Sequence, residues 1–207
     1  ALVEYFKSAP PEDAAWATAF LIGDRPKRAV PAALLIEAVC RRANIPVWLF
    51  DECREQVGDN SEAMALLLPD DGEKLVVPQL STLIETRLLP LKALEKERGK
   101  QAVVDVVLAT WDELGPLERF VWNKLLGGAF RVGVAKALVI QALAAVADVD
   151  NAVIAARLTG GFDKTAAGFL ALTAKDETAT KDPARPYPFF LASPIPGAHP
   201  SDLGAPA

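Results

Sequence analysis

The most constraining feature of the sequence is a helix, a short basic link and a second helix between residues 125 and 146. The pair Gly127–Gly128 ends one apolar run, and a second run, starting near Val134, is apolar at steps of three and four residues, the helical period. Arg131 and Gly133 stand just before this second helix. Its free N–H groups and positive dipole end suit an anion such as phosphate. The alternative is an ordinary corner with a surface arginine.

The same pattern occurs twice. A shift of 104 residues places residues 11–68 on residues 115–172 without a gap, and it matches Trp16 with Phe120 and Lys27 with Arg131. We interpret the two stretches as copies of one helical unit that pack as pseudo-symmetric halves. The alanine- and leucine-rich sequence therefore predicts an all-α, multi-helix fold of about ten to twelve helices.

Both copies place basic residues in the link, and paired basic corners could contact the two phosphate strands of a duplex. Gly133 would let the backbone approach a phosphate closely. Asp59 can equally be a plain helix cap, and Asp163 is expected to cap a helix over 164–174. The candidate DNA-binding residues are Lys27, Arg28, Arg131, Gly133, Lys136, Lys164 and Thr165, together with Gly58, Asp59 and Lys124.

Residues 120–146, FVWNKLLGGAFRVGVAKALVIQALAAV, resemble the R-x-G-(V/L)-A segment of the N-terminal DNA-binding domain of ATP-dependent DNA ligases. Residues 57–59, followed by an apolar helix, are also similar to that domain. Residues 187–192, YPFFLA, are similar to the linker that leads into the adenylation domain in a bacterial branch of these ligases. The resemblance covers residues 2–195 and implies a domain that holds the minor groove around a nick without reading sequence, in DNA repair or replication.

The resemblance also implies what the parent enzyme does. That enzyme would seal a 3′-hydroxyl to a 5′-phosphate with ATP and Mg²⁺. Its nucleophilic lysine lies in a K-x-D-G motif, which this chain lacks, and the single histidine, His199, lies in a proline-rich tail. We therefore expect a non-catalytic helical domain over residues 1–182 and a linker over 183–207. The expected partners are nicked double-stranded DNA and the adenylation and OB domains of the parent chain.

The charge leaves a second hypothesis open. The net charge of −5 counts against a general nucleic-acid binder. Residues 24–42, however, hold five bases and two acids, a sum of +3, while residues 51–74 hold two bases and eight acids, a sum of −6. One face could thus bind DNA with strong salt dependence. The alternative is a helical protein-interaction scaffold, which would be favoured if the basic candidates scatter over the surface.

Other sequence features bear on where the protein acts and on which kinds of site it could have. Cys40 and Cys53 form neither a disulfide framework nor a zinc pattern, and no segment of the sequence has the pattern of a membrane span or a signal peptide. We expect a monomer in the cytoplasm of a bacterium, associated with the nucleoid. A small-molecule enzyme would need a pocket with paired titratable groups, and no such pattern occurs in the sequence.

Overall fold

The structure is a computed structural model that describes residues 1–69, 78–128, 133–159 and 161–175. The described residues form eleven α-helices, one π-helix and no strand, which confirms the all-α prediction. The elements are α1 (Leu2–Ser8), α2 (Pro11–Leu21), α3 (Ala32–Ala43), α4 (Val47–Val57), α5 (Asn60–Leu67), α6 (Leu80–Leu83), η1 (Ile84–Leu88), α7 (Leu91–Glu113), α8 (Pro116–Gly127), α9 (Lys136–Ala147), α10 (Asn151–Arg157) and α11 (Ala166–Leu172). The predicted linker over 183–207 lies outside the described residues.

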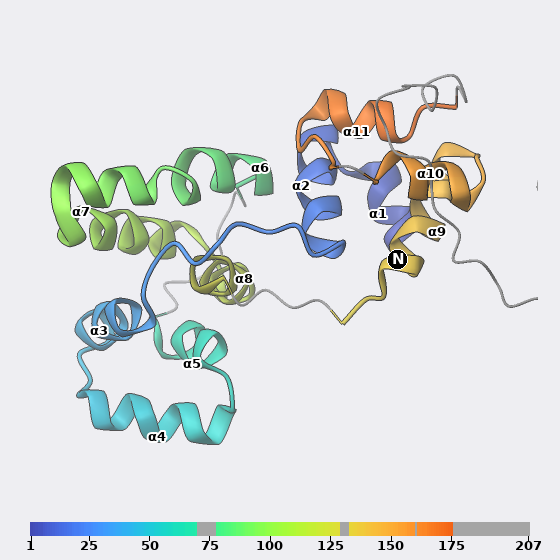
Figure 1. Cartoon of the computed structure of the whole chain (residues 1–207). Helices are drawn as coiled ribbons and strands as arrows, with labels where there is room; N and C mark the ends of the chain where they lie inside the picture. The colour runs from blue at the N-terminus through green and yellow to red at the C-terminus, as the bar shows by residue number, and fades with distance from the viewer. Residues whose placement is uncertain (70–77, 129–132, 160, 176–207) are drawn as a thin grey trace, which may run out of the picture.

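The helices form two lobes. Helices α3 to α8, consecutive in the chain, make the first lobe, and α1, α2, α9, α10 and α11 make the second (Figure 1). The first lobe buries Phe50, Trp111 and Leu126 among others, and the second buries Leu143 and Ile154. The second lobe is therefore built from both ends of the described chain.

Helix α2 lies between the two cores. Its Trp16 and Phe20 belong to the core of the first lobe, whereas Ala14 and Ala15 belong to the core of the second. Each apolar side chain that leaves water contributes on the order of 1–3 kcal/mol to stability, so α2 ties the two lobes together.

The lobes do not coincide with the two sequence copies. Helix α3 (32–43), shifted by 104 residues, has the bounds of α9 (136–147). Helix α8 of the second copy nevertheless packs against α5 of the first, and α2 of the first packs against α11 of the second. The first helix of each copy, α2 or α8, thus packs against a helix of the other copy. That the halves are related by descent or symmetry stays a prediction.

Two links carry the chain between the lobes. The first link, residues 22–31, runs from α2 to α3, and the second link, residues 128–135, runs from α8 to α9. Gly128 ends α8 in the left-handed conformation at φ 64°, where a Cβ would also meet the backbone nitrogen of Arg28 at 2.8 Å. Helix α9 starts at Lys136, two residues later than expected, because Ala135 is still extended.

Two helix starts correct the sequence-based caps. Thr165, not Asp163, caps α11: its hydroxyl accepts from the N–H of Gly168 at 3.1 Å and donates to the Asp163 carboxylate at 2.8 Å. A Cβ on Gly168 would stand 2.1 Å from the Asp163 carbonyl oxygen, so glycine is needed for this close approach. The sequence also predicts that Asp148 or Asp150 caps a helix over 151–158, and Asp150 does stand before α10, but no side chain makes a capping hydrogen bond there.

The sequence of residues 80–89 predicts one helix that ends before Pro90, whereas the structure has α6 followed by the π-helix η1. Arg87 of η1 donates to the Thr110 hydroxyl at 3.0 Å and to the Glu113 carboxylate at 2.7 Å, so it ties η1 to the end of α7. Helix α7 is broken at Gly99, which has φ 81° and ψ 176°. The wider π turn could not be inferred from the apolar period.

The first lobe contains a buried polar network. Arg119, 2% exposed, donates to the carbonyl oxygens of Trp111 and Pro69, both at 2.7 Å. Asn123 accepts from the Trp111 indole at 2.8 Å and donates to the Ser61 carbonyl at 3.2 Å. These bonds join α5, α7 and α8, and the two that involve Trp111 are buried.

No single helix of the described residues is both long and apolar enough to cross a membrane. Helices α9 and α10 pass that test only when taken together, and they are bent by 109° to each other. Their side chains Val139, Leu143 and Ile154 are buried in the second core.

Candidate nucleic-acid interface

The first link lies against the C-terminal end of α8 (Figure 1). The N–H groups of Ala29 and Val30 donate to the Leu126 carbonyl at 3.0 and 3.2 Å, and Arg28 Nε donates to the Gly127 carbonyl at 3.4 Å. These donors satisfy carbonyls that a helix end leaves unpaired. The first link thus rests where the second link begins, and Arg28 has a structural role beside any role in binding.

The other end of the first link is held by the start of α11. Lys164 Nζ lies 2.9 Å from the Asp24 carboxylate and 5.8 Å from the centroid of the Trp16 ring. Thr165, the next residue, has its hydroxyl occupied as the cap of α11. Both sequence-predicted residues therefore lie beside the link, but their polar groups already have partners in the chain.

A second ion pair lies one helical turn before Gly128. Lys124 of α8 pairs with the Asp59 carboxylate, and its ammonium lies 5.4 Å from the centroid of the Phe120 ring. Asp59 also caps α5 by accepting from the N–H groups of Ser61 and Glu62 at 2.8 and 3.0 Å, which confirms its interpretation as a cap. Gly58, at φ 81°, ends α4 just before it.

The two lysines use matched aromatic rings. Trp16 and Phe120 are 104 residues apart, and each has a lysine ammonium over its face. The lysines themselves are not matched: Lys124 comes from the same helix as its ring, whereas Lys164 comes from the start of α11. Each of the two matched rings thus has a lysine ammonium over its face, although the two lysines come from unmatched positions in the chain. Cation–π contacts of this kind contribute about 0.5–1 kcal/mol at exposed sites.

Opposing effects act on the pKa of Asp59. Partial burial alone would raise the pKa, but the hydrogen bond and charge of Lys124, with the N–H groups of Glu62 and Ser61, hold it below its usual value. The charged carboxylate is therefore favoured in the folded state.

We predict that Asp59→Asn costs stability in a pH-dependent way. Asparagine keeps a capping oxygen but has no charge for Lys124. Because the folded-state pKa is depressed, the wild-type advantage is complete above the unfolded value of about 3.9 and is lost as pH falls through the folded value. Thermal unfolding of both proteins from neutral pH down to about pH 3 measures this. A difference in Tm that does not close in acid would contradict a role for the charge.

The helices that follow the two links have open N-termini. Neither α3 nor α9 has a side-chain cap or an acidic residue in its first turn. Lys136, the first residue of α9, is exposed, and so is Gly133, where an added Cβ would meet no atom within 4 Å. Among the described residues, no hydrogen bond or ion pair engages Lys27 or Lys136. Arg131 lies outside the described residues.

The structure therefore joins most of the candidates by contact. A continuous path runs from Gly58 and Asp59 through Lys124 and the end of α8 to Arg28 and Lys27, and on through Asp24 to Lys164 and Thr165. We call these residues, with Gly133 and Lys136 at the start of α9, the crossover surface. Sequence reasoning missed Asp24 and Gly128. The signal for Gly128 was the double glycine, but Asp24 pairs across 140 residues and left no local signal.

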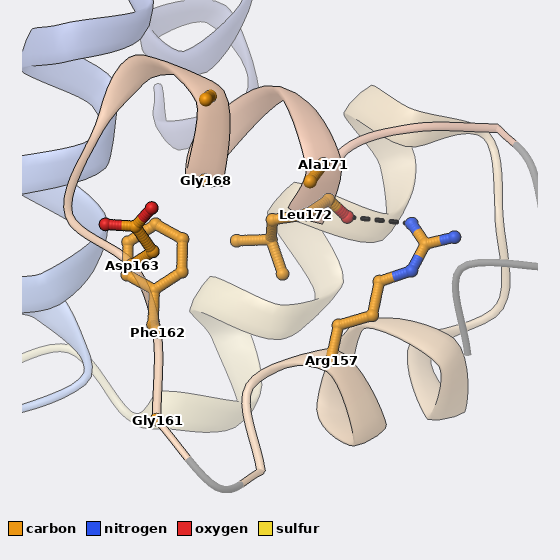
Figure 2. A pocket seen from close by; sticks show the side chains of 8 residues that line it. Arg157, Gly161, Phe162, Asp163, Gly168, Ala171 and Leu172 are labelled. Carbon is orange, nitrogen blue, oxygen red and sulfur yellow. Dashed lines mark hydrogen bonds between the residues drawn. The ribbon is translucent and has the colours of Figure 1, made fainter. Parts of the chain in front are cut away.

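A recess beside the crossover surface explains how α11 is positioned. It measures about 320 Å³ and is lined by Phe162, Asp163, Gly168 and Leu172 among others. Figure 2 shows Arg157 at its rim, donating to the Leu172 carbonyl at 2.8 Å. Arg157 also donates to the Ala174 carbonyl at 2.7 Å. The buried guanidinium thus satisfies the last carbonyl of α11 and one just beyond it, and it fixes the helix whose start carries Lys164.

The molecule is an all-α domain of two lobes, with basic residues on the links that join them. A model of the DNA ligase N terminus family matches residues 1–144, which span α1 to most of α9. The chain therefore belongs to this family, the N-terminal domain of ATP-dependent DNA ligases. No curated protein matches the chain.

Proposed function

We propose that this domain binds duplex DNA without sequence preference, through phosphates flanking the minor groove around a nick, for a ligase of DNA repair or replication. Family membership supports a role in a DNA ligase. The observation that carries the proposal is the contact of the first link with α8: Ala29 and Val30 bond to Leu126, and Gly128 abuts Arg28. This contact places the first link against the start of the second link, so cations from both lobes can face one duplex.

We assign different roles to the cations of the crossover surface. Lys27 and Lys136 are exposed and would contact phosphates directly, with Arg131 and Arg28. Lys124 and Lys164 are held by carboxylates at the ends of α8 and of the first link, and they would position the links. Such contacts fix the duplex but carry no sequence information.

The parent reaction, joining of a 3′-hydroxyl and a 5′-phosphate, would take place outside this chain. The chain has no K-x-D-G motif. Among its described residues, no three His, Cys, Asp or Glu side chains gather as a metal site requires. We propose that ATP and Mg²⁺ are bound by an adenylation domain with which this domain sits around the DNA.

We predict that Arg131→Ala weakens binding to nicked duplex and flattens the salt dependence. Loss of one phosphate contact should reduce the slope of log K against log salt by about 0.9, because fewer counterions are released. Fluorescence anisotropy of a labelled nicked duplex across a salt series measures both quantities. Lys92→Ala is the matched control, since Lys92 is exposed on α7 and the variant loses the same charge.

The outcome separates the two hypotheses. Equal slopes for Arg131→Ala and Lys92→Ala would remove Arg131 from the interface. No binding of the wild type even at low salt would reject DNA binding and favour the protein-interaction scaffold, which the net charge of −5 also suits.

A further inference from the structure

Helix α4 exposes a large apolar side chain that the crossover surface does not use. Trp48 is 66% exposed and its neighbour Val47 is 54% exposed, both in the first turn of α4. The other tryptophans, Trp16, Trp111 and Trp122, are all buried. Tryptophan is enriched where proteins bind proteins, because one ring offers a large contact area at a small entropic cost.

An open groove lies beside this pair. It measures about 520 Å³ and runs along the corner between α3 and α4, where Cys40, Ile45, Pro46 and Val47 form its apolar part. Glu37, Arg41 and Asn44 line the rest, and the opposite charges of Glu37 and Arg41 leave the groove itself without a net charge. Burial and the charge of Asp51 raise the pKa of the Cys40 thiol, so it stays neutral and belongs to the apolar lining. The groove can take an apolar side chain next to the Trp48 ring.

The exposed face of α4 is acidic. Glu52 and Glu55 are exposed and follow Trp48 at four and seven residues, so all three lie on one side of the helix. Asp51 pairs with Arg54 at 3.4 Å, which leaves the two glutamates as the uncompensated charges of α4. This face repels phosphate and attracts a cationic partner.

The acidic and apolar face occurs in one lobe only. The residues 104 positions after Val47, Trp48 and Glu52 are Asn151, Ala152 and Ala156. A feature for holding a pseudo-symmetric duplex would be expected in both copies. Figure 1 also shows α4 at the outer edge of the first lobe, packed on α3 and α5 and away from the first link.

We infer that this face of α4 is a docking site for a segment of a partner protein that carries an apolar side chain flanked by lysines or arginines. The apolar side chain enters the groove beside Trp48, and the flanking cations pair with Glu52 and Glu55. Charge complementarity selects such a segment over nucleic acid. The inference does not rest on DNA binding at the crossover surface.

The first experiment uses a fluorescein-labelled synthetic peptide with two leucines between pairs of lysines. We expect it to bind the whole chain and to shield Trp48 from acrylamide, since Trp48 is the accessible tryptophan. Trp48→Ser should weaken binding, measured by anisotropy, about tenfold or more, as truncation of a central aromatic does. Leu117→Ser, at a leucine 70% exposed on α8, is the control and should bind as the wild type does.

A charge-reversal variant tests whether Glu52 and Glu55 pair with the cations of the partner segment. The double variant Glu52→Lys with Glu55→Lys should lose the lysine peptide and gain a peptide with glutamates in place of the lysines. All four residues altered here are exposed, and equal thermal unfolding of the variants confirms that they fold. Equal binding of a peptide with serines for leucines, or unchanged binding to Trp48→Ser, would overturn the inference. Shielding of Trp48 by duplex DNA, or by rising protein concentration alone, would overturn it in favour of those occupants.

Discussion

Alanine at Lys27, Arg28 and Lys136 together is expected to weaken binding of nicked duplex on the order of 100-fold at about 0.1 M salt. Each cation that neutralises a phosphate releases condensed counterions, so loss of three contacts should reduce the salt slope by about 2.7. The three residues come from the first link and the start of α9, and Lys27 and Lys136 are exposed. The variant therefore removes cations from both sides of the crossover surface at once.

Anisotropy across a salt series measures the loss. The matched control is alanine at Lys92, Lys96 and Lys100, all exposed on α7, which changes the net charge by the same amount. If both triple variants lose affinity equally, the effect is one of net charge, and the crossover surface is not the interface. Because Arg28 also donates to the Gly127 carbonyl, Arg28→Lys and a thermal unfolding curve show whether the link itself has moved.

Replacement of Arg119 by leucine is expected to lower the free energy of unfolding by about 3 kcal/mol. Arg119 is 2% exposed and donates to two carbonyl oxygens at 2.7 Å, those of Trp111 and Pro69. Leucine would leave both oxygens without this donor, the Trp111 oxygen in a buried place and the Pro69 oxygen in a partly buried one. A buried acceptor that loses its partner costs its desolvation energy, which exceeds the gain from one apolar side chain.

Urea unfolding followed by circular dichroism measures this change as a lower midpoint at unchanged slope. The matched variant is Arg42→Leu, which removes a partly exposed pair with Asp112 and should cost about 1 kcal/mol or less. Equal costs for the two variants would contradict the assigned role of Arg119. A smaller slope for Arg119→Leu would instead indicate that the first lobe unfolds separately.

The helix ends that a glycine marks were predictable because such an end is encoded within a few residues. Gly128, the stop expected from the sequence, adopts positive φ, as do Gly58 and Gly99, and side-chain-bearing residues rarely adopt it. Each of the three ends or breaks a helix. The order of helix, glycine stop, basic link and helix was visible for the same reason. Asp59 was also predictable as a cap, since a cap needs only its next three residues.

The partners across the chain were not predictable. Lys124 and Asp59 are 65 residues apart and Lys164 and Asp24 are 140 apart, so no local pattern marks either pair. A basic residue at a helix end looks the same in sequence whether it faces a phosphate or a carboxylate. Arg119 is buried by the fold, and its bonds to Trp111 and to Pro69, 50 residues away, follow no local pattern. Nor does an offset of 104 residues say whether helices pack within a copy or across copies.

The exchange of α2 and α8 bears on how such a chain could arise. In a protein with a single copy, the first helix would not pack on the other helices of that copy. The core could be completed only by the first helix of a second molecule. If the two stretches descend from one unit, the ancestral form would be a two-fold homodimer with swapped helices, and gene fusion would keep the contacts of α2 with α11 and of α5 with α8. Fusion also frees the copies to diverge: α8 carries Arg119 and Asn123 where α2 carries Ala15 and Ala19.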